Sequence, residues 1–186
     1  MLLFGGFLPG VDCCKAAEAP PAEGGMLPSI SLPIPDQASE REYLGLGAGG
    51  VFKIPEVRAD LIIIEVFSMY CPFCQKEAPN VNELFRLIEN NSQWKNRIKI
   101  IGIGAGNSPF EVGVFRKTYS VPFPLFPDND FSCYEALGKA RTPFFIVIKL
   151  EKHGSHKIIY SKGGGFGDPK DFLELLLKQS GLQKGT

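Results

Sequence analysis

Apolar residues are arranged along the chain in a pattern that alternates between strands and helices. Four short runs are dominated by apolar, largely β-branched residues, namely Leu61–Phe67, Ile98–Ile103, Phe144–Ile148 and His156–Tyr160. Runs of this kind are typical of strands that are covered on both faces of a sheet. The polar stretch Glu151–Ser155 joins the third run to the fourth, which predicts a hairpin between them.

Helical signals lie between and after these runs. Apolar residues recur at spacings of three and four after the first run, at Ala78, Val81, Leu84, Phe85 and Ile88. A capping box with proline at the first helical position begins a second helix at Ser108. Asp130 begins a short helix that Gly138 ends, and Asp168 begins a last helix that ends at Gly181. We therefore expect an α/β fold, with a mixed central sheet and helices on both faces.

The first part of the chain differs from the rest. Residues 1–35 hold six of the 15 prolines and show almost no periodic pattern. Met1–Val11 is apolar, and Ala16–Gly25 is a low-complexity run of proline and small residues. We expect residues 1–35 to be a leader remnant or tether with a linker, residues 36–182 the domain, and residues 183–186 a tail.

This layout is typical of an exported domain, so we expect a periplasmic or other extracytoplasmic location in a bacterium. A membrane tether through the N-terminus is one form that this takes, with Cys13 or Cys14 as the candidate for lipidation; a disordered terminus is the alternative. Beyond the terminus, apolar runs such as Leu61–Ile64 are far shorter than the roughly 18 residues of a membrane span.

Composition narrows the class of partner. The chain has 20 basic and 20 acidic residues in 186, so a neutral protein gives no electrostatic reason to expect nucleic acid. Five cysteines are too few for a disulfide scaffold.

The chemistry of the sequence centres on Cys71 and Cys74, which follow the first strand and begin a helix. Their spacing places the two sulfur atoms near each other across one helical turn. Cys71 would lie at the helix N-terminus, where free N–H groups and the helix dipole lower a thiol pKa, so it is the expected nucleophile. Cys74, one turn later and better covered, is the expected resolving thiol, and Pro72 is tolerated because its missing N–H is not needed there.

Two other uses of these cysteines are disfavoured. Zinc needs four ligands, and the remaining candidates, Cys133, His153 and His156, lack ligand spacing, so we expect no metal and no bound cofactor. An inert structural disulfide is disfavoured because a helix N-terminus activates a thiol. We expect Cys133 to be a half-buried helix residue.

The segment Phe67–Pro79 (FSMYCPFCQKEAP) resembles the active-site segment of thioredoxin-fold proteins of the TlpA/ResA type, and Arg141-Thr142-Pro143 resembles their threonine–cis-proline loop. The resemblance spans about residues 34–181. It implies a thioredoxin-like fold, a cis Thr142–Pro143 bond packed against the cysteines, and Thr142 backbone groups that pair with an extended substrate. Ser68 and Tyr70 replace the two usual tryptophans of that segment, so substrate contacts are expected to differ.

The resemblance implies a thiol-disulfide oxidoreductase that acts on protein thiols and disulfides, with a redox partner that recycles the cysteine pair. We expect the reducing direction rather than the oxidising one. The expected substrate-binding residues are Tyr70, Pro72, Phe73, Thr142 and Pro143.

Two acidic residues are further candidates. Glu65 lies within an otherwise apolar strand, where an unpaired carboxylate is costly, so a functional role is expected. It stands six residues before Cys71, where the resemblance implies a buried acid that assists proton transfer to the resolving cysteine. Glu77 stands three residues after Cys74, where the resemblance implies an active-site glutamate; the alternative for it is a solvated helix residue.

Two alternative functions stay open at this point. A thiol peroxidase of the peroxiredoxin-related group needs Ser or Thr three residues before its reactive cysteine, and Ser68 stands there, although the intact cysteine pair argues against it. A non-catalytic thioredoxin-fold binding module is the second, and the presence of both Cys71 and Cys74 argues against that.

Overall fold

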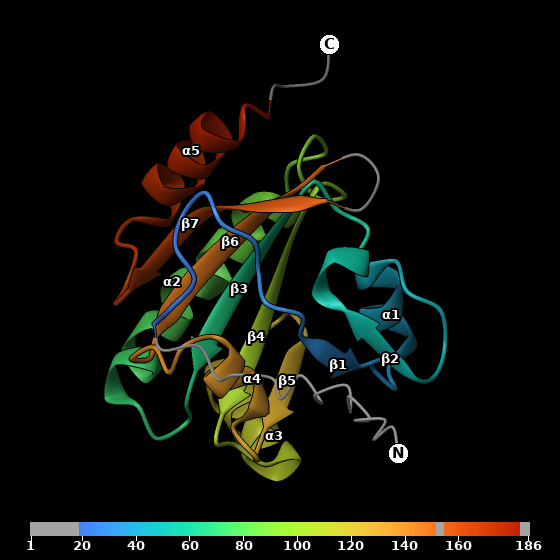
Figure 1. Ribbon diagram of the computed structural model, residues 1–186, viewed down its shortest axis with the longest axis vertical. Coiled ribbons are helices and arrows are strands. Elements are labelled where there is room, and N and C mark those ends of the chain that lie inside the picture. The colour runs from blue at the N-terminus through green and yellow to red at the C-terminus, as the bar shows by residue number, and fades with distance from the viewer. Residues whose placement is uncertain (1–18, 152–154, 183–186) are drawn as a thin grey trace, which may run out of the picture.

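The computed structural model describes residues 19–151 and 155–182. Its centre is a five-stranded sheet in the order β5-β4-β3-β6-β7. The strands are β3 (Leu61–Phe67), β4 (Ile98–Ala105), β5 (Leu125–Asp128), β6 (Phe144–Leu150) and β7 (His156–Gly163). β3, β4 and β5 run parallel to one another, whereas β6 and β7 are antiparallel to their neighbours. This confirms the mixed sheet and places β3 at its centre (Figure 1).

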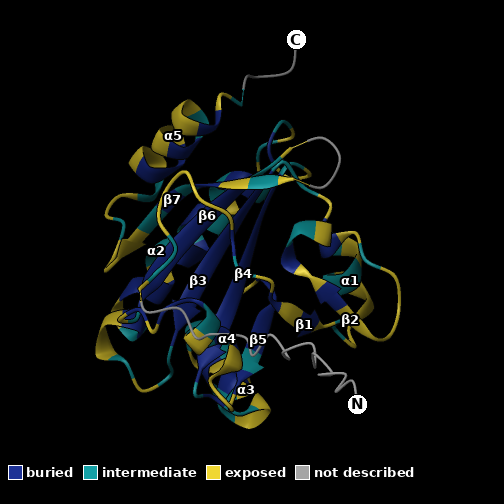
Figure 2. Ribbon diagram, viewed as in Figure 1, coloured by how far each residue is buried: buried dark blue, intermediate teal, exposed yellow. Residues whose placement is uncertain are grey.

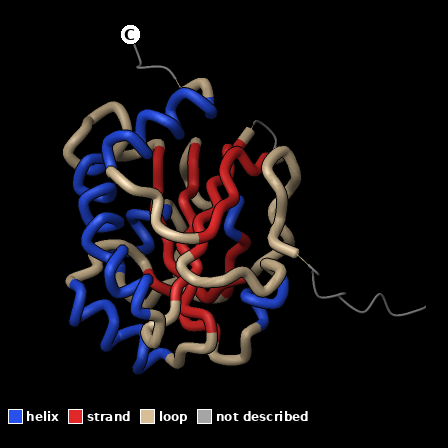
Figure 3. The backbone as a smooth tube through the Cα atoms, turned by 90° about the vertical axis from the view of Figure 1, so that its left-hand side faces the viewer, coloured by secondary structure: helices blue, strands red, loops and turns tan. Residues whose placement is uncertain are grey.

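Helices cover both faces of this sheet, as expected (Figure 3). One face packs against α2 (Pro72–Glu89), α3 (Pro109–Tyr119) and α5 (Pro169–Ser180). The other face packs against a smaller layer, formed by α1 (Ala38–Leu44), α4 (Ser132–Ala136), the two-stranded sheet of β1 (Ser31–Pro33) and β2 (Val51–Lys53), and the short 3₁₀ helix η1 (Ile54–Glu56). Among the described residues, no helix is sufficiently long and apolar to cross a membrane.

The ends of the helices follow the expected local chemistry. Glu111 accepts the Ser108 backbone N–H at 2.7 Å, and the Ser108 hydroxyl accepts the Glu111 N–H at 3.3 Å, which completes the capping box of α3. Asp168 caps α5 with its side chain alone, which accepts the N–H of Lys170 at 2.8 Å. Gly181 ends α5 with φ of 66°, a left-handed conformation that glycine adopts without steric cost.

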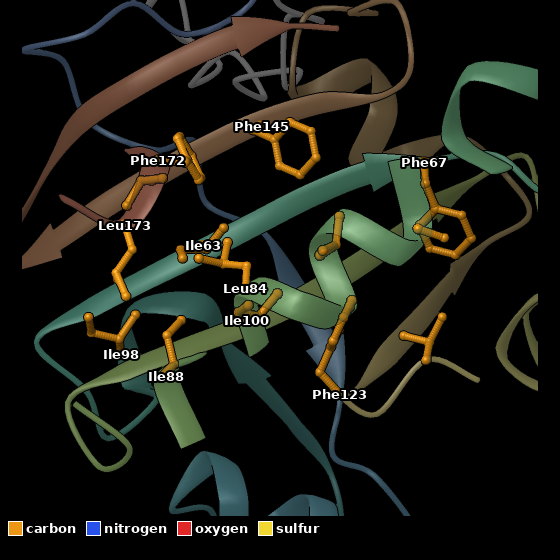
Figure 4. Close-up of a cluster of buried hydrophobic side chains, with 14 of the residues drawn as sticks. Ile63, Phe67, Leu84, Ile88, Ile98, Ile100, Phe123, Phe145, Phe172 and Leu173 are labelled. Atoms are coloured by element: carbon orange, nitrogen blue, oxygen red, sulfur yellow. The ribbon is translucent and has the colours of Figure 1, made fainter. Parts of the chain in front are cut away.

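The interior lies on both sides of β3 and β4, whose residues are all buried (Figure 2). On the α2 side, aliphatic residues of the two strands meet the apolar stripe of α2 and the rings of Phe145 and Phe172 (Figure 4). Burying a side chain of this size contributes about 1.5–3 kcal/mol, so this layer fixes α2 firmly against the sheet.

The folded structure begins earlier than the boundary expected at residue 36. Leu27, Ile30 and Leu32, all assigned to the linker by the sequence pattern, are at most 5% exposed, and β1 pairs with β2. The apolar residues of this segment are too few and too irregularly spaced to show a strand or helix period. Only the tertiary packing therefore reveals that they belong to the core. The leader or tether expected within residues 1–18 lies outside the described residues.

Two smaller expectations were inaccurate. The helix expected from Asp130 begins only at Ser132, because Phe131 takes a left-handed conformation with φ of 62° and the buried Asp128 carboxylate accepts the N–H groups of Cys133 and Tyr134 instead. β5 was not expected, since Pro127 interrupts its apolar pattern; at a sheet edge proline is tolerated.

Candidate active site at the start of helix α2

Cys71 and Cys74 lie at the N-terminus of α2, shortly after the end of β3. Cys71 is the N-cap residue of α2, with extended backbone angles (φ −84°, ψ 113°), and Pro72 is the first helical residue. The Cys71 N–H donates to the Ser68 carbonyl at 3.0 Å, which closes the turn between strand and helix. The backbone N–H groups of Phe73 and Cys74, in the first helical turn, therefore act on the Cys71 sulfur and favour a thiolate.

The two thiols differ in environment. Both are free, but Cys71 is half-buried whereas Cys74 has no exposed surface. Partial burial acts to raise the pKa of Cys71, yet hydrogen bonds from the Thr142 side chain and from Cys74 and Phe73 outweigh it, so its pKa lies below the ordinary value. Burial raises the pKa of Cys74 far above that value. The arrangement provides one thiol ready to attack and one held protonated.

The loop before β6 closes over the first cysteine. The Cys71 thiol donates to the carbonyl oxygen of Thr142 at 3.3 Å, although the two residues are 71 positions apart. The Thr142–Pro143 peptide bond is cis. The Pro143 carbonyl accepts the N–H of Gly164 at 2.8 Å, so the end of β7 holds this loop in place. Two segments joined only by the fold thus form one site.

Glu65 lies inside the sheet beneath α2. Side chains alternate along β3, and Ile63 and Phe67 on either side of Glu65 both pack on the α2 face, so Glu65 points to that face as well. It is 2% exposed, and its Oε1 has no hydrogen-bond partner within the described residues. Burial, followed by the charge of Glu77, raises the pKa of Glu65 from 4.5 to about 8. Its carboxyl group is therefore mostly protonated at neutral pH, with a minor ionised fraction.

Glu77 is also buried, which argues against the solvated alternative, but it is fully hydrogen bonded. Its Oε1 accepts the Phe166 N–H at 3.1 Å, and its Oε2 accepts the Asn80 side-chain amide at 3.2 Å. A Cβ atom on Gly165 would lie 2.5 Å from Oε2, so a glycine is required beside this carboxylate. Glu77 thus attaches α2 to the loop of residues 163–167.

The remaining expected substrate-binding residues surround the cysteines. Phe73 and Tyr70 are 72% and 66% exposed, and the Tyr70 hydroxyl donates to Glu111 on α3. A cleft of about 650 Å³ begins beside Phe73 and passes between α2 and the end of β7. Its walls are Phe73, Lys76, Glu77, residues 141–143, Gly163, Gly164, Gly165 and Gly167.

Sequence reasoning missed two features of the site. The glycine-rich loop of residues 163–167 holds Glu77 and forms a wall of the cleft. Asn107 is completely buried, and its side-chain oxygen accepts the Met69 N–H at 2.8 Å, which orients the turn before Cys71. A polar residue two positions after the end of β4 was the signal that could have identified it.

The other candidate ligands lie elsewhere. Cys133 packs on the opposite face of the sheet from Cys74, and His156 accepts the Leu27 N–H at 3.0 Å. His153 lies outside the described residues. Within the described part of the chain, no group of three or more His, Cys, Asp or Glu side chains could hold a metal ion.

Known proteins resemble this chain over most of its length. The AhpC/TSA family matches residues 25–159. Two curated relatives, both named thiol-disulfide oxidoreductase ResA, come from Halalkalibacterium halodurans and Geobacillus thermodenitrificans. The first is 23% identical over 129 residues, 69% of each chain, and the second is 23% identical over 126 residues, 68% of each chain.

Solved structures agree on the fold. The thioredoxin domain of a thiol-disulfide oxidoreductase from Bacteroides vulgatus covers 83% of this chain and 97% of its own, with a TM-score of 0.60 and 12% identity. StoA from Bacillus subtilis covers 68% of this chain and 88% of its own, with a TM-score of 0.52 and 19% identity. The fold is thioredoxin-like, as the resemblance in the sequence implied.

Proposed function

Because the chain belongs to the AhpC/TSA family, we propose that it is a thiol-disulfide oxidoreductase that exchanges disulfides with protein substrates through Cys71 and Cys74. The observation that carries the proposal is the pair of free thiols one helical turn apart, with pKa values shifted in opposite directions. The name of both curated relatives supports the same activity.

The exchange has two steps. The Cys71 thiolate attacks one sulfur of a substrate disulfide, the substrate S–S bond breaks, and the departing substrate thiolate takes up a proton. Cys74 then loses its proton and attacks the Cys71 sulfur, so that the second substrate thiol leaves and a Cys71–Cys74 disulfide forms. Two electrons have passed to the substrate, and a dithiol redox partner returns the pair to the reduced form.

Glu65 is the proposed base for the second step. Cys74 is fully buried and held protonated, so it needs a nearby acceptor for its proton. Glu65 lies beneath the same helix with one unpartnered oxygen, and because its pKa is about 8, a minor fraction of it is ionised near neutral pH and can accept that proton. The ionised form of Glu65 is energetically unfavourable in this buried position, which favours uptake of the Cys74 proton.

Glu77 has a proposed role of a different kind. Both of its oxygens are engaged, so it positions α2 against the loop of residues 163–167 rather than standing free to carry a proton. The proposed substrate-binding residues are Thr142, whose carbonyl accepts a hydrogen bond from the Cys71 thiol, the adjoining Pro143, and the exposed Tyr70, Pro72 and Phe73. An extended substrate would pair with the Thr142 backbone.

Reduction is the proposed direction. The groups that lower the pKa of Cys71 are chiefly uncharged hydrogen-bond donors, acting against burial. A strong oxidant is one whose reduced form is much stabilised, so thiolate stabilisation by uncharged groups favours a reductant. A redox titration tests it: we expect a reduction potential near −270 mV, about that of thioredoxin, and a value near −120 mV would contradict the direction.

Location is proposed from the sequence. An apolar start followed by a proline- and alanine-rich stretch supports an extracytoplasmic domain with an N-terminal tether. Fractionation of cells that produce the full chain tests it, with the periplasmic or membrane fraction expected.

The cysteine variants test the main proposal. Cys71→Ser should abolish disulfide exchange, whereas Cys74→Ser should accumulate mixed disulfides with substrates, because only the resolving step is lost. Non-reducing electrophoresis and mass spectrometry measure both. Full activity in Cys71→Ser would show that the nucleophile is assigned wrongly. Cys133→Ser, on the other face of the sheet, is the matched control and should retain activity.

The proton-transfer role of Glu65 has its own test. In Glu65→Gln the first adduct should form at a near-normal rate, since the helix terminus still activates Cys71, but resolution should slow about 10²-fold or more. Stopped-flow measurement separates the two steps. If attack slows and resolution does not, Glu65 acts on Cys71 or on packing instead.

A thiol peroxidase is the second candidate. The observation that favours it is the position of Ser68, three residues before Cys71. Peroxide consumption by the reduced protein discriminates between the two. Rapid consumption that persists in Cys74→Ser and disappears in Cys71→Ser would favour the peroxidase.

A further inference from the structure

We infer that the cleft beside Cys71 selects an extended client segment that carries acidic side chains close to its reactive cysteine. The inference rests on the proposed function and adds the class of substrate. It follows from where charge lies around the cysteine pair.

The cleft continues directly from the reactive sulfur. Thr142, whose carbonyl accepts the Cys71 thiol, and the adjoining Pro143 both line it. A client strand that pairs with Thr142 would therefore continue into a cleft of about 650 Å³. Residues next to the client cysteine must meet the walls of this cleft.

The accessible charges of the cleft have one sign. Three charged side chains line it, namely Lys76, Glu77 and Arg141. Glu77 is 8% exposed, and its oxygens already accept the Phe166 N–H and the Asn80 amide, so little of its charge faces a ligand. Lys76 and Arg141 are exposed, one on α2 and the other before the cis peptide bond. A client meets two cations there.

The opposite flank of Cys71 has different chemistry. There the Tyr70 hydroxyl donates to the Glu111 carboxylate on α3, and this bond is the main reason that the pKa of Glu111 is lowered. Glu111 is therefore charged at neutral pH. The site is cationic on the side of β7 and anionic on the side of α3, so an acidic client residue is favoured on one side of its cysteine only.

The wall opposite α2 allows close approach of a backbone. It consists largely of Gly163, Gly164, Gly165 and Gly167, which present no side chain. Gly164 and Gly167 have φ of 89° and 84°, which only glycine adopts readily, and Gly165 has no room for a Cβ atom. A main chain can therefore lie against this wall while its side chains reach Lys76 and Arg141.

Reduction of short peptides with an internal disulfide tests the inference. The peptides differ only in carrying two Asp or two Lys residues, either before or after the attacked cysteine, and hydroxyethyl disulfide serves as an uncharged substrate. We expect the Asp peptide to react about fivefold faster than its Lys counterpart in one of the two positions, at low salt. The ratio should approach one at about 1 M salt.

Charge reversal identifies the residues. The double variant Lys76→Glu, Arg141→Glu should reverse the Asp-to-Lys ratio, and using a ratio cancels any change in Cys71 reactivity. The matched control Lys117→Glu, Lys178→Glu changes net charge equally at exposed positions on α3 and α5 outside the cleft, and it should keep the ratio.

The outcomes distinguish failure of the inferred client preference from failure of the proposed function. If hydroxyethyl disulfide is reduced but neither peptide position shows a preference, or if the control variant abolishes the preference as strongly as the cleft variant, the inference is wrong while the function stands. If the wild-type protein reduces neither peptides nor the small disulfide, the proposed function itself fails.

Discussion

The two faces of β3 show how one strand serves stability and chemistry at once. Toward the smaller layer of α1 and α4, it presents Ile62, Ile64 and Val66, which pack into a wholly apolar cluster. Toward α2 it presents Leu61, Ile63 and Phe67, but also Glu65. The first face contributes packing alone. The second includes a neutral carboxyl group that is kept beneath the cysteine pair at the expense of stability.

The difference shows that burial has opposite effects on stability at the two faces of β3. Removing an isoleucine from water contributes stability, whereas removing a carboxylate from water is unfavourable unless it is paired or protonated. On the α2 face the unfavourable effect appears as raised pKa values in Glu65 and Cys74. Perturbed groups of this kind are expected where protons must move.

The largest expected effect is a loss of stability when packing on the apolar face of β3 is disrupted. Ile64 has no exposed surface, so Ile64→Ala should lower the free energy of unfolding by about 4 kcal/mol through lost burial and a cavity. Urea unfolding measures it. The pH midpoint of Cys71 alkylation should stay unchanged in the folded variant; a shift would show that the two faces are coupled. Ile64→Val, expected to cost about 1 kcal/mol, covers the case in which the alanine variant does not fold.

The next effect concerns the pH dependence of stability on the α2 face. Between pH 4.5 and about 8 the unfolded chain releases the Glu65 proton while the native state keeps it, so native Glu65 binds more protons and stability falls as pH rises. Below this range both states are protonated, and above it both are ionised. From pH 5 to pH 8 the wild type should lose about 3 kcal/mol relative to Glu65→Gln.

Denaturant unfolding at several pH values measures this difference. Glu174→Gln, at an exposed position on α5, is the control and should follow the wild type. Parallel curves for the wild type and Glu65→Gln would show that Glu65 is not protonated in the native state.

A smaller effect sharpens the contrast between the two buried glutamates. In Gly165→Ala the new Cβ would lie 2.5 Å from the Glu77 Oε2, so the carboxylate must move away from Phe166, at a cost of about 1–2 kcal/mol. Thermal unfolding measures it. Gly113→Ala, with open space at its Cβ inside helix α3, should stabilise slightly. Equal effects of both variants would contradict the anchoring role of Glu77.

The smallest effect is a shift in reactivity between the two thiols. Iodoacetamide should label Cys71 with a pH midpoint below the free-thiol value of about 8.5, while Cys74 stays protected in the folded protein. Peptide mapping by mass spectrometry follows each cysteine separately. Equal labelling of both, with an unshifted midpoint, would contradict the asymmetry of the pair.

The sequence by itself determined the elements whose signals are local. The strands β3, β4, β6 and β7 and the helix ends at Ser108, Asp168 and Gly181 were evident, because apolar periodicity and capping act over a few residues. The cysteine pair, Glu65 and the loop at Thr142 could be singled out for the same reason. Each has an unusual residue type beside a regular element.

Only the tertiary structure decided which of these residues meet. It brings Thr142 onto Cys71 across 71 positions, joins Glu77 to Phe166, and includes residues 27–32 in the core. It also leaves one carboxyl oxygen of Glu65 without a hydrogen-bond partner, whereas both carboxyl oxygens of Glu77 accept hydrogen bonds. Burial, hydrogen bonding and charge around a group depend on segments far apart in the chain, and local periodicity contains no information about how those segments pack.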